Sequence, residues 1–121
     1  MNSEEGSSLR VAVVGPCASG KSTLVSALRD AGYDARHVAQ DHSFVSDMWR
    51  RVSQPDILIY LDVTYEAIKR RRPKTTYRPA DLIEQEKRLA HARENCDFLI
   101  DTTPLTPSEV LQAALRNLEA L

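Results

Sequence analysis

The chain has 121 residues, of which 42% are hydrophobic and 27% charged. This size and balance fit one globular domain with a single core and argue against extensive disorder. The 16 basic and 17 acidic residues give a formal net charge of -1, which argues against nucleic acid as a partner. No apolar run approaches the roughly 20 residues of a membrane span, and the first residues lack the pattern of a secretory signal. We therefore expect a cytoplasmic protein without a membrane partner.

A polar tail and a strand–helix–strand unit are predicted in the amino-terminal part of the chain. Residues 1–8 are polar, and we expect them to form a flexible tail. Residues 9–14 form a short β-branched run, which predicts a buried strand. Apolar residues recur at helical spacing over residues 24–31, and Gly32 stands where a helix-ending glycine is expected. A second, weaker strand is predicted over residues 35–39.

A short helix and the clearest strand follow. Four apolar residues share one face of the predicted helix, and Ser43 is its expected cap. These apolar residues are Val45, Met48, Trp49 and Val52. Residues 56–63 are apolar at nearly every position rather than alternating, which is typical of a parallel strand covered on both faces.

Two helices, a strand and a final helix complete the pattern. Thr64 is the expected cap of a helix that must end before Pro73. A longer helix is predicted over residues 80–95 and a fourth strand over residues 98–101. The last helix begins with Thr-Pro-Ser-Glu at residues 106–109, a capping box with proline at the first helical position. The longer helix is expected to bury Leu82, Ile83, Leu89 and Ala90.

This alternation of strands and helices predicts an α/β protein. We expect a three-layer sandwich in which an open, mostly parallel sheet of about four strands is covered on both faces. Because no linker or repeat interrupts residues 9–121, they should form a single domain.

The strongest functional signal is a glycine-containing loop between the first strand and the first helix. Residues 15–23 read Gly-Pro-Cys-Ala-Ser-Gly-Lys-Ser-Thr and match G-x-x-x-x-G-K-[ST] at every required position. Glycines let the backbone curl so that N–H groups face one concavity, and the following helix adds its amides and dipole. Lys21 supplies a point charge for the β- and γ-phosphates of a nucleotide, and the Ser22 hydroxyl can bind Mg²⁺. Because Pro16 has no N–H, the predicted phosphate-binding loop relies on the amides of residues 18–23.

With this motif the chain resembles the P-loop kinases of nucleosides, nucleotides and small metabolites. Residues 58–66 are similar to the strand-to-helix stretch before the lid in thymidylate-kinase-like and deoxynucleoside-kinase-like proteins. Residues 70–72, all arginine, resemble the start of that lid, and residues 96–103 resemble the last strand with the loop beside the nucleotide base. The resemblance covers most of residues 9–121 and implies the P-loop NTPase fold, ATP or GTP as ligand and Mg²⁺ as cofactor.

The chain departs from that family in one respect. Such kinases usually have five parallel strands, and one strand-plus-helix unit is missing here before the strand at residues 56–63. In the family, the residues that grip the phosphoryl acceptor lie largely in that unit. Residues 40–43, Gln-Asp-His-Ser, are a loose counterpart of the family's acidic strand end.

A basic segment follows the clearest strand. Six lysines and arginines fall within residues 69–78, where they would close over a nucleotide as a lid or, alternatively, form a solvated face that binds other anions. Residues 102–104 would line the base. The residues expected to bind the nucleotide are Gly15, Ala18, Ser19, Gly20, Lys21, Ser22, Thr23, Arg70 and Thr103.

Two aspartates are candidates for metal or proton chemistry. Asp41 is the expected acidic partner of the metal: it would bind Mg²⁺ through water, or accept a proton from an acceptor hydroxyl. The equal alternative is that it caps the following turn. Asp62 ends the clearest strand as a metal-binding aspartate would, although its surroundings match a later strand of the family.

Four other residues have a functional and a structural interpretation. His42 is a candidate to assist the acceptor, or a capping or surface residue. Phe44 and Trp49 would form an apolar wall for a ring-shaped acceptor, or pack against the sheet. Cys17 is a small side chain in a permissive position, or a thiol whose oxidation would block the loop.

These observations predict ATP- and Mg²⁺-dependent phosphoryl transfer to a small hydroxyl or phosphate acceptor, such as a nucleoside or nucleotide. Lys21, Asp41 and Arg71 are the expected catalytic residues, with Ser22 and Asp41 as metal ligands. The alternative is a nucleotide-binding module or switch without small-molecule kinase activity, completed by a partner. A nucleic-acid-associated NTPase is a third reading, which rests on the basic segment alone. An exposed sheet edge in so small a domain would allow a homodimer.

Overall fold

One open sheet of four parallel strands forms the centre of the molecule. The computed structural model describes residues 9–121, so the tail predicted at residues 1–8 lies outside the described residues. The strands stand in the order β2-β1-β3-β4, and all neighbouring pairs are parallel. Their bounds are Arg10–Val14 for β1, Asp34–His37 for β2, Ile57–Asp62 for β3 and Phe98–Asp101 for β4.

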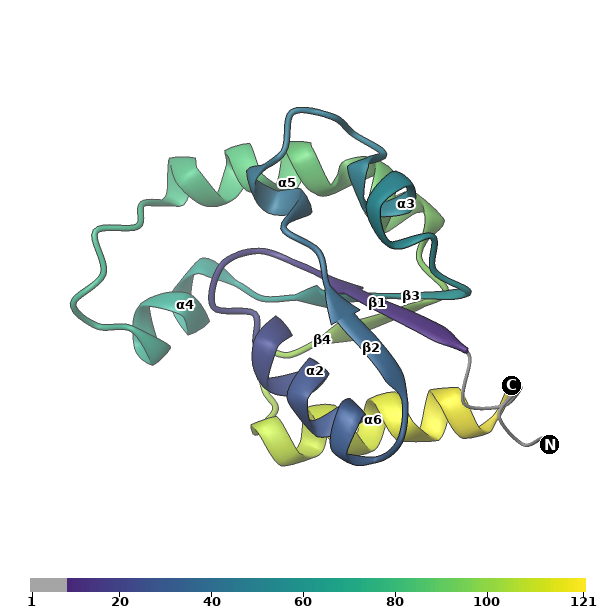
Figure 1. Ribbon diagram of the computed structural model, residues 1–121. Coiled ribbons are helices and arrows are strands. Elements are labelled where there is room, and N and C mark those ends of the chain that lie inside the picture. Colours follow the sequence, from purple (N-terminus) through teal and green to yellow (C-terminus); the bar gives the residue numbers. More distant parts are fainter. Residues whose placement is uncertain (1–8) are drawn as a thin grey trace, which may run out of the picture.

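Helices cover both faces of this sheet. Helices α2 and α6 lie on one face and α3 and α5 on the other, while α4 lies beyond the carboxyl end of β3 (Figure 1). The predicted α/β class and four-stranded parallel sheet are therefore confirmed. The helical elements are α2 (Lys21–Asp30), the 3₁₀ helix η1 (Gln40–His42), α3 (Met48–Ser53), α4 (Tyr65–Arg71), α5 (Pro79–Asn95) and α6 (Pro107–Glu119).

Alternate residues of the central strands pack into opposite layers. In β1, Val11 and Val13 join the core formed with α2 and α6, whereas Ala12 and Val14 join the core formed with α3 and α5. Strand β3 divides its residues in the same way and is buried at five of its six positions. The uninterrupted apolar run of β3 follows from this two-sided burial, because neither of its faces meets water.

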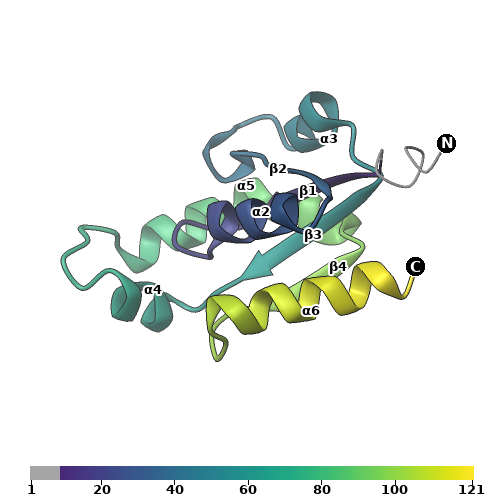
Figure 2. The same ribbon diagram turned by 60° about the horizontal axis from the view of Figure 1, so that its bottom comes forward.

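The strand order creates a topological switch point at the carboxyl end of β1. The first connection runs through α2 to β2 on one side of β1, and the next runs through α3 to β3 on the other side. Figure 2 shows α2 and α6 in front of the sheet, where they pack against each other, and α3 at the top of the view. Because the two connections diverge on opposite faces, the loop after β1 borders an open crevice, the usual ligand site of such sheets.

The short helix α3 differs from its prediction. It begins at Met48, and Ser43 does not cap it, because the Ser43 Oγ accepts the Val45 N–H at 3.1 Å in a turn before the helix. Val45 and Val52 are 50% and 66% exposed, so the expected apolar face is wrong at these two positions.

The buried face of α5 also differs from its prediction. Leu82 and Leu89 are buried as expected, but Ile83 and Ala90 are exposed. The buried stripe continues instead through Gln85. A glutamine therefore occupies a core-facing position of α5.

The two predicted threonine caps are confirmed. The Thr64 Oγ1 accepts the Ala67 N–H at 3.2 Å at the start of α4. At the start of α6, the Thr106 Oγ1 accepts the Glu109 N–H at 3.2 Å, and the Glu109 carboxylate accepts the Thr106 N–H at 2.8 Å. This reciprocal pair satisfies two amides that the helix cannot pair itself.

None of the helices described between residues 9 and 121 combines the length and apolar character needed to cross a bilayer.

The capping box of α6 gives a stability test. Thr106→Ala should lower the free energy of unfolding by about 1 kcal/mol, because the Glu109 N–H loses its acceptor. Thr106→Ser keeps the hydroxyl and should remain close to the parent protein. Urea denaturation followed by circular dichroism measures both, and equal stabilities of the two variants would contradict the role given to the cap.

Candidate functional site

The glycine loop, residues 15–20, connects β1 to α2 at the switch point. Gly15 lies against the end of β3, where an added Cβ would stand 2.5 Å from the Leu61 carbonyl oxygen, so a larger residue does not fit. Ala18 and Gly20 both have positive φ, 61° and 97°. This left-handed backbone curls the loop tightly, and at Ala18 it does so in a conformation that non-glycine residues rarely adopt.

The start of α2 presents amides that the helix does not use. The first intrahelical bond runs from the Leu24 N–H to the Gly20 carbonyl at 3.0 Å. The amides of residues 21–23 precede that bond, so they have no intrahelical acceptor. They therefore point a positive dipole end toward the loop, which favours an anion there.

Two amides of the glycine loop are used within the protein. The Cys17 N–H donates to the Gln85 Oε1 at 3.0 Å, and the Ser19 N–H donates to the Pro16 carbonyl at 3.2 Å. In this conformation the predicted cradle of residues 18–23 therefore lacks the Ser19 amide. The Ser19 hydroxyl is buried and has no hydrogen-bond partner among the described residues.

The Lys21 side chain folds back over the glycine loop. Its Nζ donates to the Gly15 carbonyl at 2.6 Å and the Pro16 carbonyl at 3.1 Å, and it lies 3.4 Å from the Asp41 Oδ2. Only 13% of this side chain is exposed, so oxygen atoms replace most of the water around its charge. An ammonium held in this way by neutral carbonyls and one carboxylate can exchange its carbonyl partners for the oxygens of an anion.

Asp41 lies in η1, four residues beyond the end of β2, and faces Lys21. It is 1% exposed, and its Oδ2 also lies 3.4 Å from the His42 Nε2. Its Oδ1 is buried without a hydrogen-bond partner among residues 9–121, an arrangement that costs roughly 1–3 kcal/mol. Among the described residues, its hydrogen-bond donors are the side chains of Cys17 and Lys21 rather than a backbone amide of the following turn.

Gln40 fixes η1 in place. Its Nε2 donates to the Val45 carbonyl at 2.8 Å and the Arg88 carbonyl at 3.1 Å, and its Oε1 accepts the Trp49 N–H at 2.8 Å. Because this side chain is completely buried and joined to α3 and α5, it sets the position of the neighbouring Asp41.

Two hollows flank the glycine loop. The η1 hollow, about 290 Å³, brings together Lys21, Ser22 and Asp41, which include both predicted metal ligands. The α6 hollow, about 230 Å³, lies between the loop, the end of α4 and the start of α6. The two share the residues Ala18, Gly20, Thr23 and Arg72.

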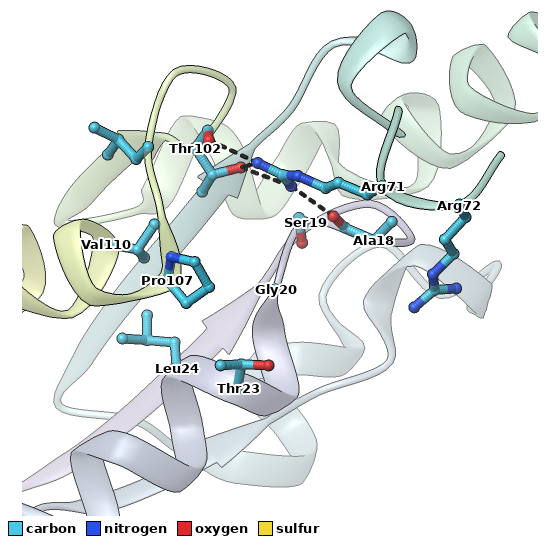
Figure 3. A pocket seen from close by; sticks show the side chains of 11 residues that line it. Ala18, Ser19, Gly20, Thr23, Leu24, Arg71, Arg72, Thr102, Pro107 and Val110 are labelled. Carbon is cyan, nitrogen blue, oxygen red and sulfur yellow. Dashed lines mark hydrogen bonds between the residues drawn. The ribbon is translucent and has the colours of Figure 1, made fainter. Parts of the chain in front are cut away.

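Arg71 closes one side of the α6 hollow. Figure 3 shows its guanidinium bridging the loop and the end of β4, with bonds of 2.7 Å to the Ala18 carbonyl and 2.7 Å to the Thr102 carbonyl. Burial, followed by the charge of Arg70, lowers the pKa of Arg71 from its ordinary value. A nearby anion would relieve this destabilisation of the charged form.

Three predicted nucleotide-binding residues line neither hollow: Gly15, which packs against the end of β3, Arg70 and Thr103. Arg70 donates to the Thr103 carbonyl at 3.4 Å, and the Thr103 Oγ1 accepts the Thr64 N–H at 3.0 Å. These contacts join the loops that follow β3 and β4. Of residues 102–104, which were expected to line the base, Thr102 lines the α6 hollow, and Arg72 lines it as well.

The remaining candidate residues line neither hollow. Asp62 is one of them, and its Oδ2 lies 3.5 Å from Arg93 of α5. Trp49 is 5% exposed and packs in the core under α3 and α5, which confirms its structural interpretation, whereas Phe44 is 85% exposed and contacts the Arg88 guanidinium. The residues at the end of the basic segment are anchored, since Arg78 pairs with Asp81 in the cap of α5.

The sequence reasoning missed Gln85, which holds the glycine loop from α5. Its Oε1 accepts the Cys17 N–H and the Tyr77 hydroxyl, the latter at 2.7 Å, and its Nε2 donates to the Cys17 Sγ at 3.1 Å. Burial raises the pKa of Tyr77, so its hydroxyl stays protonated and donates. The only local signal was a polar residue at helical spacing between Leu82 and Leu89.

The chain matches no protein-family model, and comparison with curated proteins gives no significant match. The likeness to P-loop kinases therefore rests on the residues of this chain.

We expect the hydrogen bond between Gln85 and the Cys17 N–H to make the glycine loop rigid. Gln85→Leu has similar volume but removes the acceptor of the Cys17 N–H, and it should lower the free energy of unfolding by about 1–3 kcal/mol. Hydrogen exchange should speed up at the Cys17 amide. The control is Gln112→Leu at an exposed position of α6, which should leave this exchange unchanged. Equal exchange at Cys17 in both variants would show that Gln85 does not hold the loop.

Proposed function

We propose that this protein binds the triphosphate of ATP or GTP with Mg²⁺ in the glycine loop and transfers a phosphoryl group to a small hydroxyl or phosphate acceptor. The observation that carries the proposal is the Lys21 ammonium, which lies over a curled loop beside amides of α2 that lack intrahelical acceptors. Positive charge and aligned N–H donors are what a polyphosphate requires. The protein would then be a P-loop NTPase of the nucleoside- and nucleotide-kinase type.

The residues present fit a magnesium-bound triphosphate. The amides of residues 20–23 would hold the phosphate oxygens, and Lys21 would exchange the Gly15 and Pro16 carbonyls for the β- and γ-phosphates. The Ser22 hydroxyl and the Asp41 carboxylate share the η1 hollow and supply the oxygen ligands that Mg²⁺ prefers. When bound, Mg²⁺ would neutralise charge on the transferring group.

The α6 hollow fits the nucleoside part. Apolar side chains of Leu24, Leu105 and Val110 line it, and the guanidinium of Arg71 forms one wall (Figure 3). A planar cation of this kind can stack on a base or contact phosphate. Because this hollow adjoins the glycine loop, one ligand can occupy both places.

The acceptor would approach from the η1 hollow. Asp41 lines this hollow and, as the alternative to binding Mg²⁺, would accept a proton from the attacking hydroxyl; His42 lies beside it at the surface. Arg71 and Arg72 would stabilise the charge that develops on the transferring phosphoryl group.

One observation favours a second candidate, a nucleotide-binding switch or subunit without small-molecule kinase activity. Between β2 and β3 the chain forms only η1 and the six-residue α3, in place of a further strand and helix. This short connection leaves less structure to enclose an acceptor. A partner protein would then complete the site.

Calorimetric titration tests the nucleotide site. Magnesium ATP or GTP should bind the parent protein, and Lys21→Ala should weaken binding by roughly 10–100-fold, because charge-assisted bonds to the phosphates are lost. Lys87→Ala, which removes an exposed charge on α5, is the matched control and should bind as the parent does. Equal binding by both variants would contradict the proposed role of Lys21.

Turnover separates the two candidate functions. A kinase should release ADP faster when the right nucleoside, nucleotide or small hydroxyl compound is added, and Lys21→Ala should abolish this increase. Binding without acceptor-dependent release across a broad panel would favour the switch over the kinase.

A further inference from the structure

Three metal-ligand side chains meet beside Lys21. The Cys17 Sγ lies 3.9 Å from the Asp41 Oδ2 and 4.0 Å from the His42 Nε2, and the last two atoms are 3.4 Å apart. The thiol comes from the glycine loop, and the carboxylate and imidazole come from η1. The cluster therefore spans two segments that the fold holds together independently.

The spacing of these donors is close to that of a zinc site. Bond lengths of about 2.0–2.3 Å to nitrogen, oxygen and sulfur in tetrahedral geometry place neighbouring donor atoms ~3.3–3.6 Å apart. The two distances from the Cys17 Sγ, 3.9 Å and 4.0 Å, exceed that range by a few tenths of an ångström. Because His42 is exposed and its side chain is free to adjust, a small rotation would close the triangle.

Gln85 prepares the sulfur to act as an acceptor. Its Oε1 is occupied by the Cys17 N–H and the Tyr77 hydroxyl, so its amide NH₂ must face the Cys17 Sγ, at 3.1 Å. A donor directed at sulfur orients it, as outer hydrogen bonds orient the ligands of metal centres.

The Asp41 carboxylate provides the second, independent indication of a cation. It is 1% exposed, its Oδ2 is directed into the cluster, and its Oδ1 has no partner among the described residues. Lys21, at 3.4 Å, is a distant partner for so buried a charge. A divalent ion would neutralise it more completely.

We propose that Cys17, Asp41 and His42 form a binding site for a zinc-type divalent cation, with a fourth position open to the η1 hollow. A thiolate and an imidazole favour Zn²⁺ over Mg²⁺, which prefers oxygen ligands alone. Three protein ligands and an open position leave room for water or another ligand. The site does not depend on the proposed function, since the metal would bind without nucleotide.

Lys21 would compete with the metal ion for the Asp41 carboxylate. Its ammonium and the metal would share the Asp41 Oδ2, so each disfavours the other through like-charge repulsion. Removing the ammonium should therefore tighten metal binding. This sign is opposite to the effect expected on nucleotide binding.

Titration of the nucleotide-free protein with Co²⁺ and Zn²⁺ tests the site. Co²⁺ should produce a near-ultraviolet thiolate-to-cobalt charge-transfer band, and Zn²⁺ should bind with a stoichiometry of one and remove that band. Cys17→Ser should lose the band and His42→Ala should weaken Zn²⁺ binding at least tenfold. The matched control is Cys96→Ser, which replaces the other cysteine. Cys96 lies just before β4, at the amino end of the strands, whereas Cys17 follows the carboxyl end of β1, so this variant should behave as the parent.

The outcomes decide the assignment in both directions. Absence of a charge-transfer band in the parent protein overturns the proposal without reference to any variant, as does equal Zn²⁺ affinity in Cys17→Ser and the parent. Lys21→Ala should bind Zn²⁺ severalfold more tightly, and unchanged or weaker binding would contradict the placement beside Lys21. Circular dichroism of each variant shows that it is folded. Loss of nucleotide binding alone would leave these results unaffected.

Discussion

The rest of the site depends on the contacts of the Lys21 ammonium with the glycine loop and with Asp41. The ammonium joins the Gly15 and Pro16 carbonyls of the glycine loop to the Asp41 carboxylate of η1, and most of its charge is shielded from water. A cation in such surroundings must be balanced by oxygen atoms. The two carbonyls and the Asp41 carboxylate supply these oxygens in the structure, and phosphate oxygens would replace the carbonyls in the proposed nucleotide complex.

The fold brings the glycine loop and Asp41, the partners of Lys21, together from separate segments of the chain. Parallel strand order places the loop after β1 at a switch point, and Gln40 fixes η1 through contacts to α3 and α5. Gln85 fixes the loop itself from the other side. Asp41 therefore stands where two cations can use it, the ammonium of Lys21 and a divalent metal. The proposed nucleotide and zinc sites meet at this one carboxylate.

The sequence was informative where local pattern determines structure. The glycine loop, the uninterrupted apolar run of β3 and the Thr106 capping box each depend on neighbouring residues, and the structure contains all three. Contacts between segments far apart in the chain could not be predicted from the sequence. Gln85 reaches Cys17 across 68 residues, and no local pattern encodes that pairing.

The misassigned faces of α3 and α5 have a similar cause. Helical spacing alone predicted that Val52 and Ile83 are buried. Both are exposed, because each helix packs on the sheet through another face. Tertiary packing decides which side of a short amphipathic helix is buried. The same reason explains why Thr102 rather than Thr103 lines the α6 hollow, since the turn after β4 directs the Thr103 hydroxyl toward Thr64.

The most direct measurement of the central claim is a two-dimensional ¹H–¹⁵N NMR titration with inorganic triphosphate and Mg²⁺. This ligand contains the phosphates without a base or sugar, so it isolates the glycine loop. We expect the largest amide shifts at Gly20, Lys21 and Ser22, where N–H groups would meet phosphate oxygens. Shifts confined to the basic residues 69–78, or no shifts at all, would show that the loop does not bind phosphate.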